Sequence, residues 1–282
     1  MSLDANNPAA VSLDVDSWLH SLQQTIASVP SAAVALSGGV DSMTLAAVCA
    51  NTLGDRFVAI HAVSPAVPEQ ASDRVRDYAE RFGWRLEVVE AREFADPDYL
   101  ANPFNRCYFC KRNLYDRIAE VTSEQVFSGA NADDLGDFRP GLVAARERLV
   151  RHPYVEVGAD KAVVRALAAH LGLDEVKALP AMPCLSSRVE SGIRIDAQDL
   201  SLVNTVEERL REHLAAHTVR CRITHEGVHI ELDEPARVHL DSVENGRWRE
   251  HVQHDVERWC RAQGHSFGGF KPYVRGSAFI RE

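Results

Sequence analysis

No stretch of this sequence approaches the roughly 20 consecutive apolar residues that a membrane-spanning helix needs. The first 15 residues are polar and acidic, and they lack the basic start and the apolar run of a secretion signal. We therefore expect a cytoplasmic protein without a membrane partner. Thiols stay reduced in that compartment, so the six cysteines are predicted to be free, metal-bound or catalytic rather than paired in disulfides.

An excess of basic residues is also lacking. Lysine and arginine number 31 against 41 aspartates and glutamates, which gives a formal net charge of −10. Broad nucleic-acid binding needs clustered basic side chains that displace counterions from phosphates, so we expect no nucleic-acid partner. One local basic pocket for a small anionic ligand is compatible with this balance. Apolar residues make up 45% of the chain, which is enough for a buried core.

Short apolar strands alternate with helices over the first two thirds of the chain. Such alternation is typical of an α/β fold, a doubly wound parallel sheet with helices on both faces. The predicted strands cover 32–36, 56–63, 85–90 and 125–129. The predicted helices start at Ser17 or cover 41–53, 68–82 and 111–121, and a further one is capped by Asp160 and ends at Gly172.

A proline-bearing tract at 177–188 interrupts this rhythm, because proline suits neither a helix interior nor a central strand. The predicted elements beyond it are a helix at 196–214, two alternating, half-exposed strands at 219–224 and 227–232, a helix at 246–263 and a strand at 267–274. We therefore predict a smaller α+β domain for substrate binding or oligomerisation. The predicted division is a flexible tail at 1–15, the α/β domain at 16–185 and the smaller domain at 186–282.

The turn after the first predicted strand reads S-G-G-V-D-S and leads into a helix. Gly38 and Gly39 allow backbone N–H groups to point inward without a Cβ in the way, and the first N–H groups of the helix lack partners. Such a turn attracts phosphate, and the carboxylate of Asp41 suits it if Mg²⁺ accompanies the phosphates. No Gly-Lys-Ser/Thr follows, so this is not a Walker loop. The candidate phosphate-binding residues are Ser37, Gly38, Gly39, Val40, Asp41 and Ser42.

These six residues resemble the PP-loop of the ATP pyrophosphatase superfamily, and an ordinary strand-to-helix turn is the alternative interpretation. The resemblance implies that ATP is split between its α and β phosphates, that a substrate is adenylated and that pyrophosphate is released. It makes Asp41 a catalytic candidate. It also implies that the end of the second strand meets the adenine, which singles out Ala62 and Val63.

The fourth predicted strand leads into G-A-N-A-D-D-L-G-D-F-R-P-G at 129–141. The carboxyl ends of parallel strands meet at one crevice, so this segment is expected beside the PP-loop. Gly129 permits close approach, while Asp133 and Asp134 are candidates to hold Mg²⁺ or to order Arg139. A solvated acidic turn is the alternative interpretation.

The cysteines divide into two groups. Cys107 and Cys110 form a C-x-x-C motif, which by itself serves redox, zinc and iron–sulfur sites alike. Cys184 lies in a proline-bounded segment beside Arg188, whose guanidinium would favour a nucleophilic thiolate. The cysteines expected in core or structural positions are Cys49, Cys221 and Cys260.

Three motifs, R-C-Y-F-C-K, the acidic segment and P-C-L-S-S-R, together resemble the LarE family of ATP-dependent sulfur transferases, and the likeness extends over residues 15–277. The resemblance implies that a carboxylate of pyridinium-3,5-biscarboxylic acid mononucleotide, a nicotinate-derived mononucleotide, is adenylated. Sulfur then replaces the activated oxygen to give the thiocarboxylate, a step of nickel-pincer cofactor biosynthesis. The resemblance also implies a homo-oligomer such as a hexamer.

The resemblance allows two sulfur sources. In one version of the family three cysteines hold a [4Fe–4S] cluster whose open iron carries sulfide, and the matching residues are Cys107, Cys110 and Cys184. In the other version the cysteine that matches Cys184 gives up its own sulfur and becomes dehydroalanine. We favour the cluster because both C-x-x-C cysteines are present and three thiolates leave one iron open. A zinc site is less suited, since no fourth ligand is evident.

Arg220 and Arg222 lie two residues apart on a predicted strand and therefore share one face. They match arginines of the LarE family, which implies that they bind the substrate phosphate; exposed surface arginines are the alternative interpretation. Further substrate-binding candidates are Arg139, Ser187, Arg188 and Arg275. The residues that follow Arg188 and the C-terminal R-G-S-A-F-I-R-E depart from the family pattern, and both lie at the expected substrate end.

Three other functions stay open. A tRNA-thiolating PP-loop enzyme also combines C-x-x-C with a further cysteine, but it needs a basic face that this composition does not predict. An ammonia-dependent amidating ligase of the same superfamily would need neither Cys184 nor the cysteine pair. A nucleotide-sensing module without turnover would release no pyrophosphate.

Overall fold

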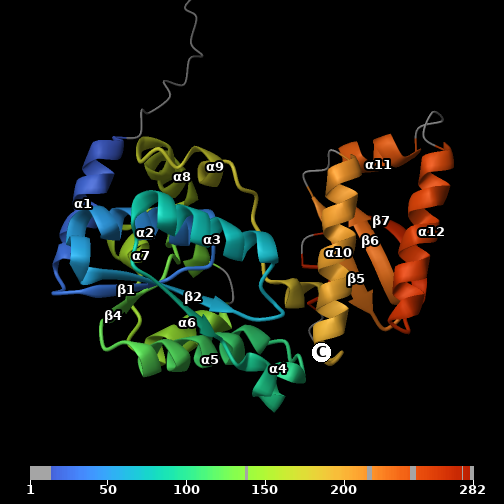
Figure 1. Cartoon of the computed structure of the whole chain (residues 1–282), viewed down its shortest axis with the longest axis horizontal. Helices are drawn as coiled ribbons and strands as arrows, with labels where there is room; N and C mark the ends of the chain where they lie inside the picture. The colour runs from blue at the N-terminus through green and yellow to red at the C-terminus, as the bar shows by residue number, and fades with distance from the viewer. Residues whose placement is uncertain (1–13, 137–138, 215–217, 242–245, 275, 280–282) are drawn as a thin grey trace, which may run out of the picture.

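The computed structural model describes residues 14–136, 139–214, 218–241, 246–274 and 276–279. The chain forms two parts, each with its own β-sheet, and Figure 1 shows them side by side. The larger part runs from α1 (Val15–Ala27) to α9 (Asp174–Lys177), and the smaller part begins with a 3-10 helix (Leu185–Arg188) that precedes α10 (Ala197–Leu214). Most of the predicted tail, residues 1–13, lies outside the described residues. Within those residues, none of the helices is both long and apolar enough to cross a membrane.

A four-stranded parallel sheet forms the centre of the larger part, in the order β3-β2-β1-β4. Its strands are β1 (Ala32–Ala35), β2 (Phe57–Val63), β3 (Leu86–Glu90) and β4 (Gln125–Phe127). Each predicted strand of this part is thereby confirmed. Because β1 lies between β2 and β4, the loops at the carboxyl ends of these strands meet at one edge of the sheet.

Helices cover both faces of this sheet (Figure 1), which confirms the predicted doubly wound α/β fold. Successive strand residues point to opposite faces, so Val34 of β1 packs in one cluster and Ala33 in another. The helices on one face are α1, α2 (Val40–Leu53), α3 (Glu69–Phe82), α7 (Pro153–Val157), α8 (Lys161–His170) and α9. The helices on the other face are α5 (Arg106–Val121) and α6 (Pro140–Glu147).

Local signals account for some helix ends but not for the short helices. The Asp160 side chain accepts a hydrogen bond from the Val163 N–H (2.9 Å) and caps α8, as predicted. Helix α5 begins at Arg106 instead of the expected residue 111, so both cysteines of the C-x-x-C motif lie in a helix. Helices such as α4 (Pro97–Leu100), of four residues, were not predicted, because they are too short to show helical periodicity.

The smaller part has a three-stranded sheet in the order β5-β6-β7. Its elements besides α10 are β5 (Val219–Thr224), β6 (Gly227–Leu232), α11 (Glu234–Asp241), α12 (Gly246–Ala262) and β7 (Phe267–Pro272). β5 and β6 pair antiparallel, whereas β7 joins β6 in parallel. Val203 of α10 and Val256 of α12 share a buried cluster with Cys221 and Ile230 of the sheet, which confirms the predicted α+β arrangement.

The expectation of half-exposed strands is wrong for β5 and β6, which are buried along nearly their whole length. One face of these strands carries apolar residues. The other face carries charged residues, and Arg222 and Glu231 are nevertheless only 5% exposed, because they pair with each other. An alternation of charged and apolar residues is therefore no sign of solvent here, since opposite charges neutralise one another inside the fold.

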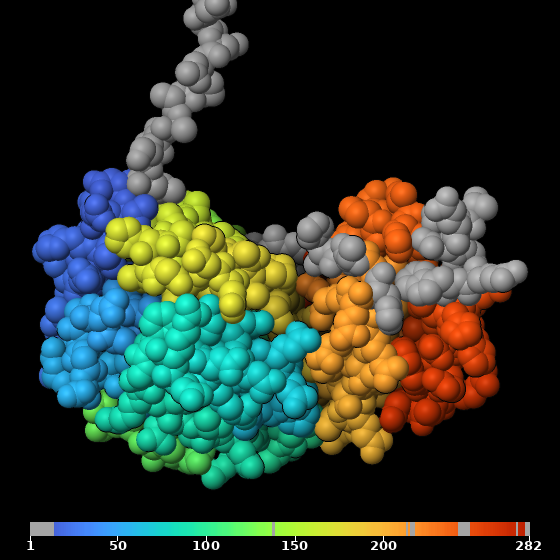
Figure 2. Space-filling model, turned by 45° about the horizontal axis from the view of Figure 1, so that its top comes forward, coloured from blue at the N-terminus to red at the C-terminus, as the bar shows by residue number. Residues whose placement is uncertain are grey.

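The segment 179–184, which has no regular structure, and several direct contacts join the two parts. The Leu185 N–H donates to the Ala66 carbonyl oxygen (2.9 Å) in the loop after β2, and the hydroxyl oxygens of Tyr99 and Ser186 lie 2.6 Å apart. In the space-filling view of Figure 2 the larger part, blue to yellow, lies directly against α10. The exact division into two domains at residue 185 stays a prediction.

Candidate active site

The loop between β1 and α2 has the geometry of an anion site. Gly38 has a φ angle of 76°, and a Cβ atom there would lie 2.6 Å from the Ala71 carbonyl oxygen of α3, so only glycine fits. Gly39 precedes α2 without a side-chain cap, which leaves the first N–H groups of the helix for a ligand. The Ser37 and Ser42 hydroxyl oxygens lie 3.0 Å apart beside them. This arrangement can bind phosphate oxygens.

The other predicted ATP-binding residues lie at the same edge of the sheet. A Cβ atom on Gly129, which follows β4, would lie 2.8 Å from the Ser42 nitrogen and 2.9 Å from the Asp41 carbonyl carbon. The chain after β4 therefore lies against the start of α2, and a side chain at residue 129 would force the two apart. Ala62 and Val63 form the carboxyl end of β2 and are half-buried.

Two residues beside Asp41 were not predicted. The Lys161 ammonium group forms an ion pair with the Asp41 carboxylate, and the Asn131 side-chain amide donates to that carboxylate (3.1 Å). Lys161 is the first residue of α8, and its backbone N–H donates to the Asp133 carboxylate (3.1 Å). A cation close to the PP-loop suits a phosphate ligand. The sequence predicted the helix start at Asp160, but it could not predict that the next residue, Lys161, contacts Asp41, because only the fold brings the two together.

Internal contacts hold the acidic segment in place. Asp134 forms an ion pair with Arg139 (2.9 Å) and accepts a hydrogen bond from the Asn131 N–H (3.0 Å). Of the two predicted roles for this carboxylate, the structure thus shows the contact with Arg139. In the described parts of the chain, no three His, Cys, Asp or Glu residues are grouped so as to hold a metal ion. Asp41 offers Mg²⁺ the oxygen ligands it prefers, and the ammonium group of Lys161 lies at that carboxylate.

Cys107 and Cys110 lie at the start of α5, and Cys184 directly precedes a 3-10 helix over Leu185–Arg188. All three are partly exposed and free of disulfides. Burial, followed by the effect of the Cys184 thiol, raises the pKa of Cys107. Burial, opposed by Lys111 and reinforced by Cys184, raises the pKa of Cys110 to about 12. Cys110 and Cys184 pack against the same buried cluster, and Cys107 lies one helical turn before Cys110, so the three thiols share one neighbourhood.

The donor set suits the predicted iron–sulfur cluster in type, since the ligands of such clusters are cysteine thiolates. The positive charges of Arg106 and Lys111 support thiolate formation, because both oppose the rise in the pKa of Cys107 that burial and Cys184 cause. Among the residues that the structure describes, the thiols do not form a preformed metal site. The three cysteines therefore fit a cluster chemically, and their side chains must converge further to hold one.

The remaining three cysteines are core residues, as predicted. Cys49, Cys221 and Cys260 are each 0% exposed. Burial raises the pKa of all three thiols, and it raises that of Cys260 to about 11. Because these three side chains are fully buried, whereas Cys107, Cys110 and Cys184 are partly exposed, a ligand cannot reach them and we expect them to be structural.

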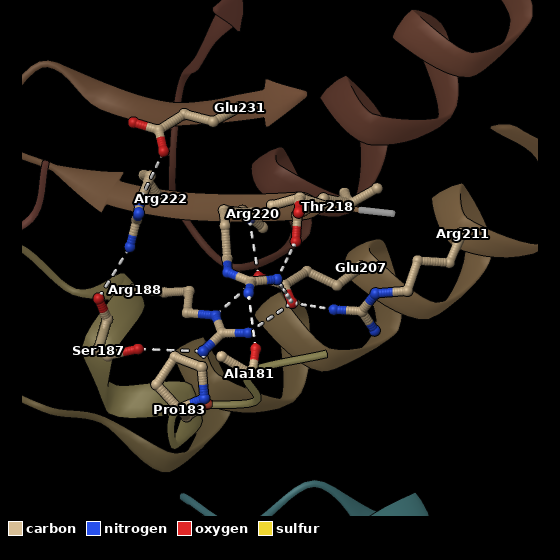
Figure 3. A network of polar contacts seen from close by, with 12 residues as sticks. Ala181, Pro183, Ser187, Arg188, Glu207, Arg211, Thr218, Arg220, Arg222 and Glu231 are labelled. Carbon is tan, nitrogen blue, oxygen red and sulfur yellow. Dashed lines mark hydrogen bonds and ion pairs between the residues drawn. The ribbon is translucent and has the colours of Figure 1, made fainter. Parts of the chain in front are cut away.

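The substrate-binding candidates of the smaller part meet in one buried polar network (Figure 3). Arg188 is 2% exposed and binds Glu207 through two hydrogen bonds of 2.8 Å each. The same guanidinium donates to the carbonyl oxygens of Pro183 (2.6 Å) and Cys184 (3.1 Å), and to the Ser187 hydroxyl (3.0 Å). Arg188 thus anchors the backbone that carries Cys184, and its charge is paired with Glu207.

Glu207 is the carboxylate at the centre of this network, and it was not predicted. It is 1% exposed and lies within ion-pair distance of Arg188, Arg211 and Arg220. Burial alone would raise its pKa, but the hydrogen bonds and charge of Arg188, followed by the charges of Arg211 and Arg220, hold that pKa below its usual range. Of the other candidates, Arg275 lies outside the described residues.

Arg220 and Arg222 lie on the same face of β5 but differ in their partners. Both are buried, so the interpretation as exposed surface arginines is wrong. Arg222 is paired with Glu231 (2.9 Å). Arg220 is 3.9 Å from Glu207, and burial, together with the charge of Arg188, lowers its pKa to about 10. Of these two arginines, Arg220 is the less well neutralised.

We compared the chain with known proteins. No protein-family model matches this chain. The chain is 41% identical to an uncharacterized protein of Synechocystis sp., over 77% of its own length and 82% of the relative's. A component of the glutamine-hydrolysing GMP synthase of Halobacterium salinarum is 26% identical, over 58% of this chain and 59% of that protein.

A third relative carries the name of an enzyme. The chain is 31% identical to the pyridinium-3,5-bisthiocarboxylic acid mononucleotide synthase of Lactiplantibacillus plantarum, over 78% of its own length and 80% of the relative's. That span takes in most of both proteins, and the chain combines a PP-loop geometry with three neighbouring thiols. The chain therefore belongs to the LarE family, the family of the pyridinium-3,5-bisthiocarboxylic acid mononucleotide synthases.

Proposed function

We propose that the protein uses ATP to adenylate a carboxylate of pyridinium-3,5-biscarboxylic acid mononucleotide and replaces the activated oxygen with sulfur. The products are the thiocarboxylate, an intermediate of nickel-pincer cofactor biosynthesis, AMP and pyrophosphate. The proposal rests on the proximity of the Cys184 segment to the PP-loop. The hydrogen bond from Leu185 to Ala66 (2.9 Å) ties the Cys184 segment to the loop between β2 and α3, and Ala71 of α3 lies against Gly38 of the PP-loop.

Adenylation comes first, because a carboxylate is a poor electrophile and AMP is a good leaving group. The N–H groups at the start of α2, with the Ser37 and Ser42 hydroxyls, would donate to the pyrophosphate as it departs. Lys161 lies at the Asp41 carboxylate, so its ammonium group is placed to exchange that partner for a phosphate oxygen. Asp41 then becomes available to Mg²⁺.

The three thiols supply the sulfur chemistry. A [4Fe–4S] cluster on Cys107, Cys110 and Cys184, when bound, would supply sulfide on the iron that has no protein ligand. In the other route the Cys184 thiolate attacks the acyl-adenylate carbon, so that a C–S bond forms and the C–O bond to AMP breaks. Loss of the Cys184 Cα proton to solvent then breaks the Cβ–S bond, which leaves dehydroalanine in the chain and releases the thiocarboxylate.

Arg220 is the group that we assign to the phosphate of the mononucleotide. It is a buried cation with a weak ion pair, and it donates to the Ala181 carbonyl oxygen (3.3 Å), three residues before Cys184. A phosphate held there would keep the substrate close to the thiol. Ser187 and Arg188 act differently in this scheme, because they hold the backbone of the Cys184 segment.

The test is an anaerobic assay of the purified protein with ATP, Mg²⁺ and the biscarboxylate mononucleotide. We expect pyrophosphate release that depends on the mononucleotide, and a thiocarboxylate product identified by mass spectrometry. The Cys184→Ala variant should still release pyrophosphate but form no thiocarboxylate. Bound iron and sulfide in the same preparation would support the cluster route, and dehydroalanine at residue 184 after turnover would support the other. Absence of pyrophosphate release with this substrate would refute the proposal.

The similarity to the GMP synthase component favours an ammonia-dependent amidating ligase as the second candidate. Such an enzyme would use the PP-loop but not the three thiols. An amide product formed from ammonia and ATP, unchanged in the Cys184→Ala variant, would identify it. The homo-oligomer, the cytoplasmic location and the absence of a nucleic-acid partner stay predictions.

A further inference from the structure

Asn102 lies between α4 and α5, four residues before Arg106, and is 0% exposed. Its φ angle is 53°, in the left-handed region that asparagine tolerates better than most residues. Its backbone N–H donates to the Tyr99 carbonyl oxygen (3.1 Å). A polar side chain at such a position needs partners for its buried amide, and the contacts of Asn102 show what they are.

The Asn102 amide binds two segments that are far apart in the sequence. Its Nδ2 atom lies 2.8 Å from the Glu190 carbonyl oxygen and 2.9 Å from the Ile193 carbonyl oxygen, which uses both N–H bonds. Its backbone carbonyl oxygen accepts from the Gly192 N–H (2.9 Å). Its Oδ1 atom accepts a hydrogen bond from Arg106, the first residue of α5.

These contacts connect α5, which carries Cys107 and Cys110, to the segment that follows Cys184. On one side, Arg106 directly precedes Cys107 on α5. On the other side, residues 190–193 follow the 3-10 helix that starts after Cys184. The Ile195 N–H donates to the Leu100 carbonyl oxygen (2.9 Å), and this hydrogen bond joins the same two stretches of chain. A change in these contacts would let the Cys184 segment move relative to α5.

We propose that Asn102 is a positioning residue that holds the Cys184 segment at a set distance from Cys107 and Cys110, so that the three thiols act as one site. The inference rests on the proposed function only in assigning these thiols to sulfur transfer. Its structural content is independent of that function. Asn102 touches neither substrate nor ATP in this scheme, so its loss should impair sulfur delivery while adenylation continues.

Two substitutions separate the contacts of Asn102. Asn102→Asp keeps the volume, the tolerance of a left-handed backbone and the acceptor for Arg106, but it places a carboxylate oxygen against the two carbonyl oxygens. Asn102→Gly keeps the backbone without strain and removes every side-chain contact. Gln125→Glu is the matched control. Gln125 also donates an amide N–H to a carbonyl oxygen across two segments (2.9 Å to Leu149), and it lies on β4 outside the thiol neighbourhood.

The direct readout is disulfide trapping. The reduced, metal-free protein is treated with diamide, which takes two electrons and two protons from each pair of thiols that it joins. Peptide mass mapping then measures the rate at which Cys184 is linked to Cys107 or Cys110. Mononucleotide-dependent pyrophosphate release and thiocarboxylate formation are measured on the same preparations, and near-ultraviolet circular dichroism checks the fold.

We expect both Asn102 variants to form these disulfides and the thiocarboxylate at least about tenfold more slowly than the native chain, while pyrophosphate release stays within about twofold. Gln125→Glu should match the native chain in all three. Native rates of disulfide formation in Asn102→Asp would overturn the inference, whatever the activity. A native chain that forms the disulfides but transfers no sulfur would refute the proposed function and leave the inference standing.

Discussion

Replacement of Glu207 by glutamine removes the one negative charge that three arginines share. The side chain is 1% exposed, and its oxygens bind Arg188 twice at 2.8 Å and accept a hydrogen bond from the Cys221 N–H (3.0 Å). Glutamine keeps the shape and one acceptor, but it leaves the buried Arg188 guanidinium without a counter-charge. Breaking a buried pair in this way costs about 3–5 kcal/mol. We expect the free energy of unfolding to fall by that amount at pH 7.

The assay is urea unfolding followed by circular dichroism at several pH values. The folded pKa of Glu207 is lowered, so its charge stabilises the fold above the unfolded pKa of about 4.3 and loses its effect as the pH falls toward the folded pKa. The difference between the native chain and Glu207→Gln should therefore be full at pH 7 and shrink below about pH 4.3.

The neighbouring Glu208 provides the control, because it is only partly buried and accepts a hydrogen bond from Asn204 (2.8 Å). Glu208→Gln should cost no more than about 0.5 kcal/mol. In a double-mutant cycle, Glu207→Gln should cost far less when Arg188 is already replaced by methionine. A loss of less than about 1 kcal/mol for Glu207→Gln at pH 7, or a loss that is the same at about pH 3 and at pH 7, would refute the reasoning.

Three further predictions concern the nucleotide and the substrate. Lys161→Ala should lower pyrophosphate release about 100-fold, because a cation beside Asp41 is lost, and Lys161→Arg should recover part of it; native rates in Lys161→Ala would contradict this role. Gly38→Ala should abolish ATP binding in calorimetry, since its Cβ would meet the Ala71 carbonyl oxygen at 2.6 Å, whereas Gly54→Ala, with open space around it, should bind ATP normally. Arg220→Gln should raise the KM for the mononucleotide about tenfold or more and leave the KM for ATP unchanged; a change in the ATP value alone would assign Arg220 elsewhere.

The sequence predicted best what depends on adjacent residues. A run of small and apolar residues predicts β1, and the two glycines that follow predict the turn into α2, because backbone angles and helix starts are local properties. The Asp160 cap is another example. The alternation of strands and helices predicts the parallel sheet, and a parallel sheet places the loops that follow its strands at one edge.

The partners of the charged side chains could not be read in the same way. Arg188 and Glu207 are 19 residues apart, and Lys161 and Asp41 are 120 residues apart. No periodicity links such pairs, so the sequence showed the arginines of the smaller part but not the carboxylates that neutralise them. The same pairing explains why β5 and β6 are buried although their pattern suggested one exposed face.

The start of α5 shows a third kind of limit. Its first residues, R-C-Y-F-C, have no clear apolar period, and the helix was therefore predicted to begin five residues later. Arg106, its first residue, donates to the Asn102 side chain four residues before it, and Asn102 in turn binds the distant residues Glu190 and Ile193. The motif itself was visible, but its placement in a helix next to the Cys184 segment was not.

The network of the smaller part has a consequence for turnover. Among the residues that the structure describes, its four guanidinium groups, on Arg188, Arg211, Arg220 and Arg222, face two carboxylates, on Glu207 and Glu231, which leaves an excess of two positive charges. A phosphate monoester carries about −1.5 to −2 at neutral pH and would complete the balance. In the proposed reaction the substrate and the thiocarboxylate product bear the same phosphate, so exchanging one for the other would leave the charge balance of this network unchanged. Release of the product alone would leave these charges unbalanced, and we therefore expect an incoming mononucleotide to promote product release.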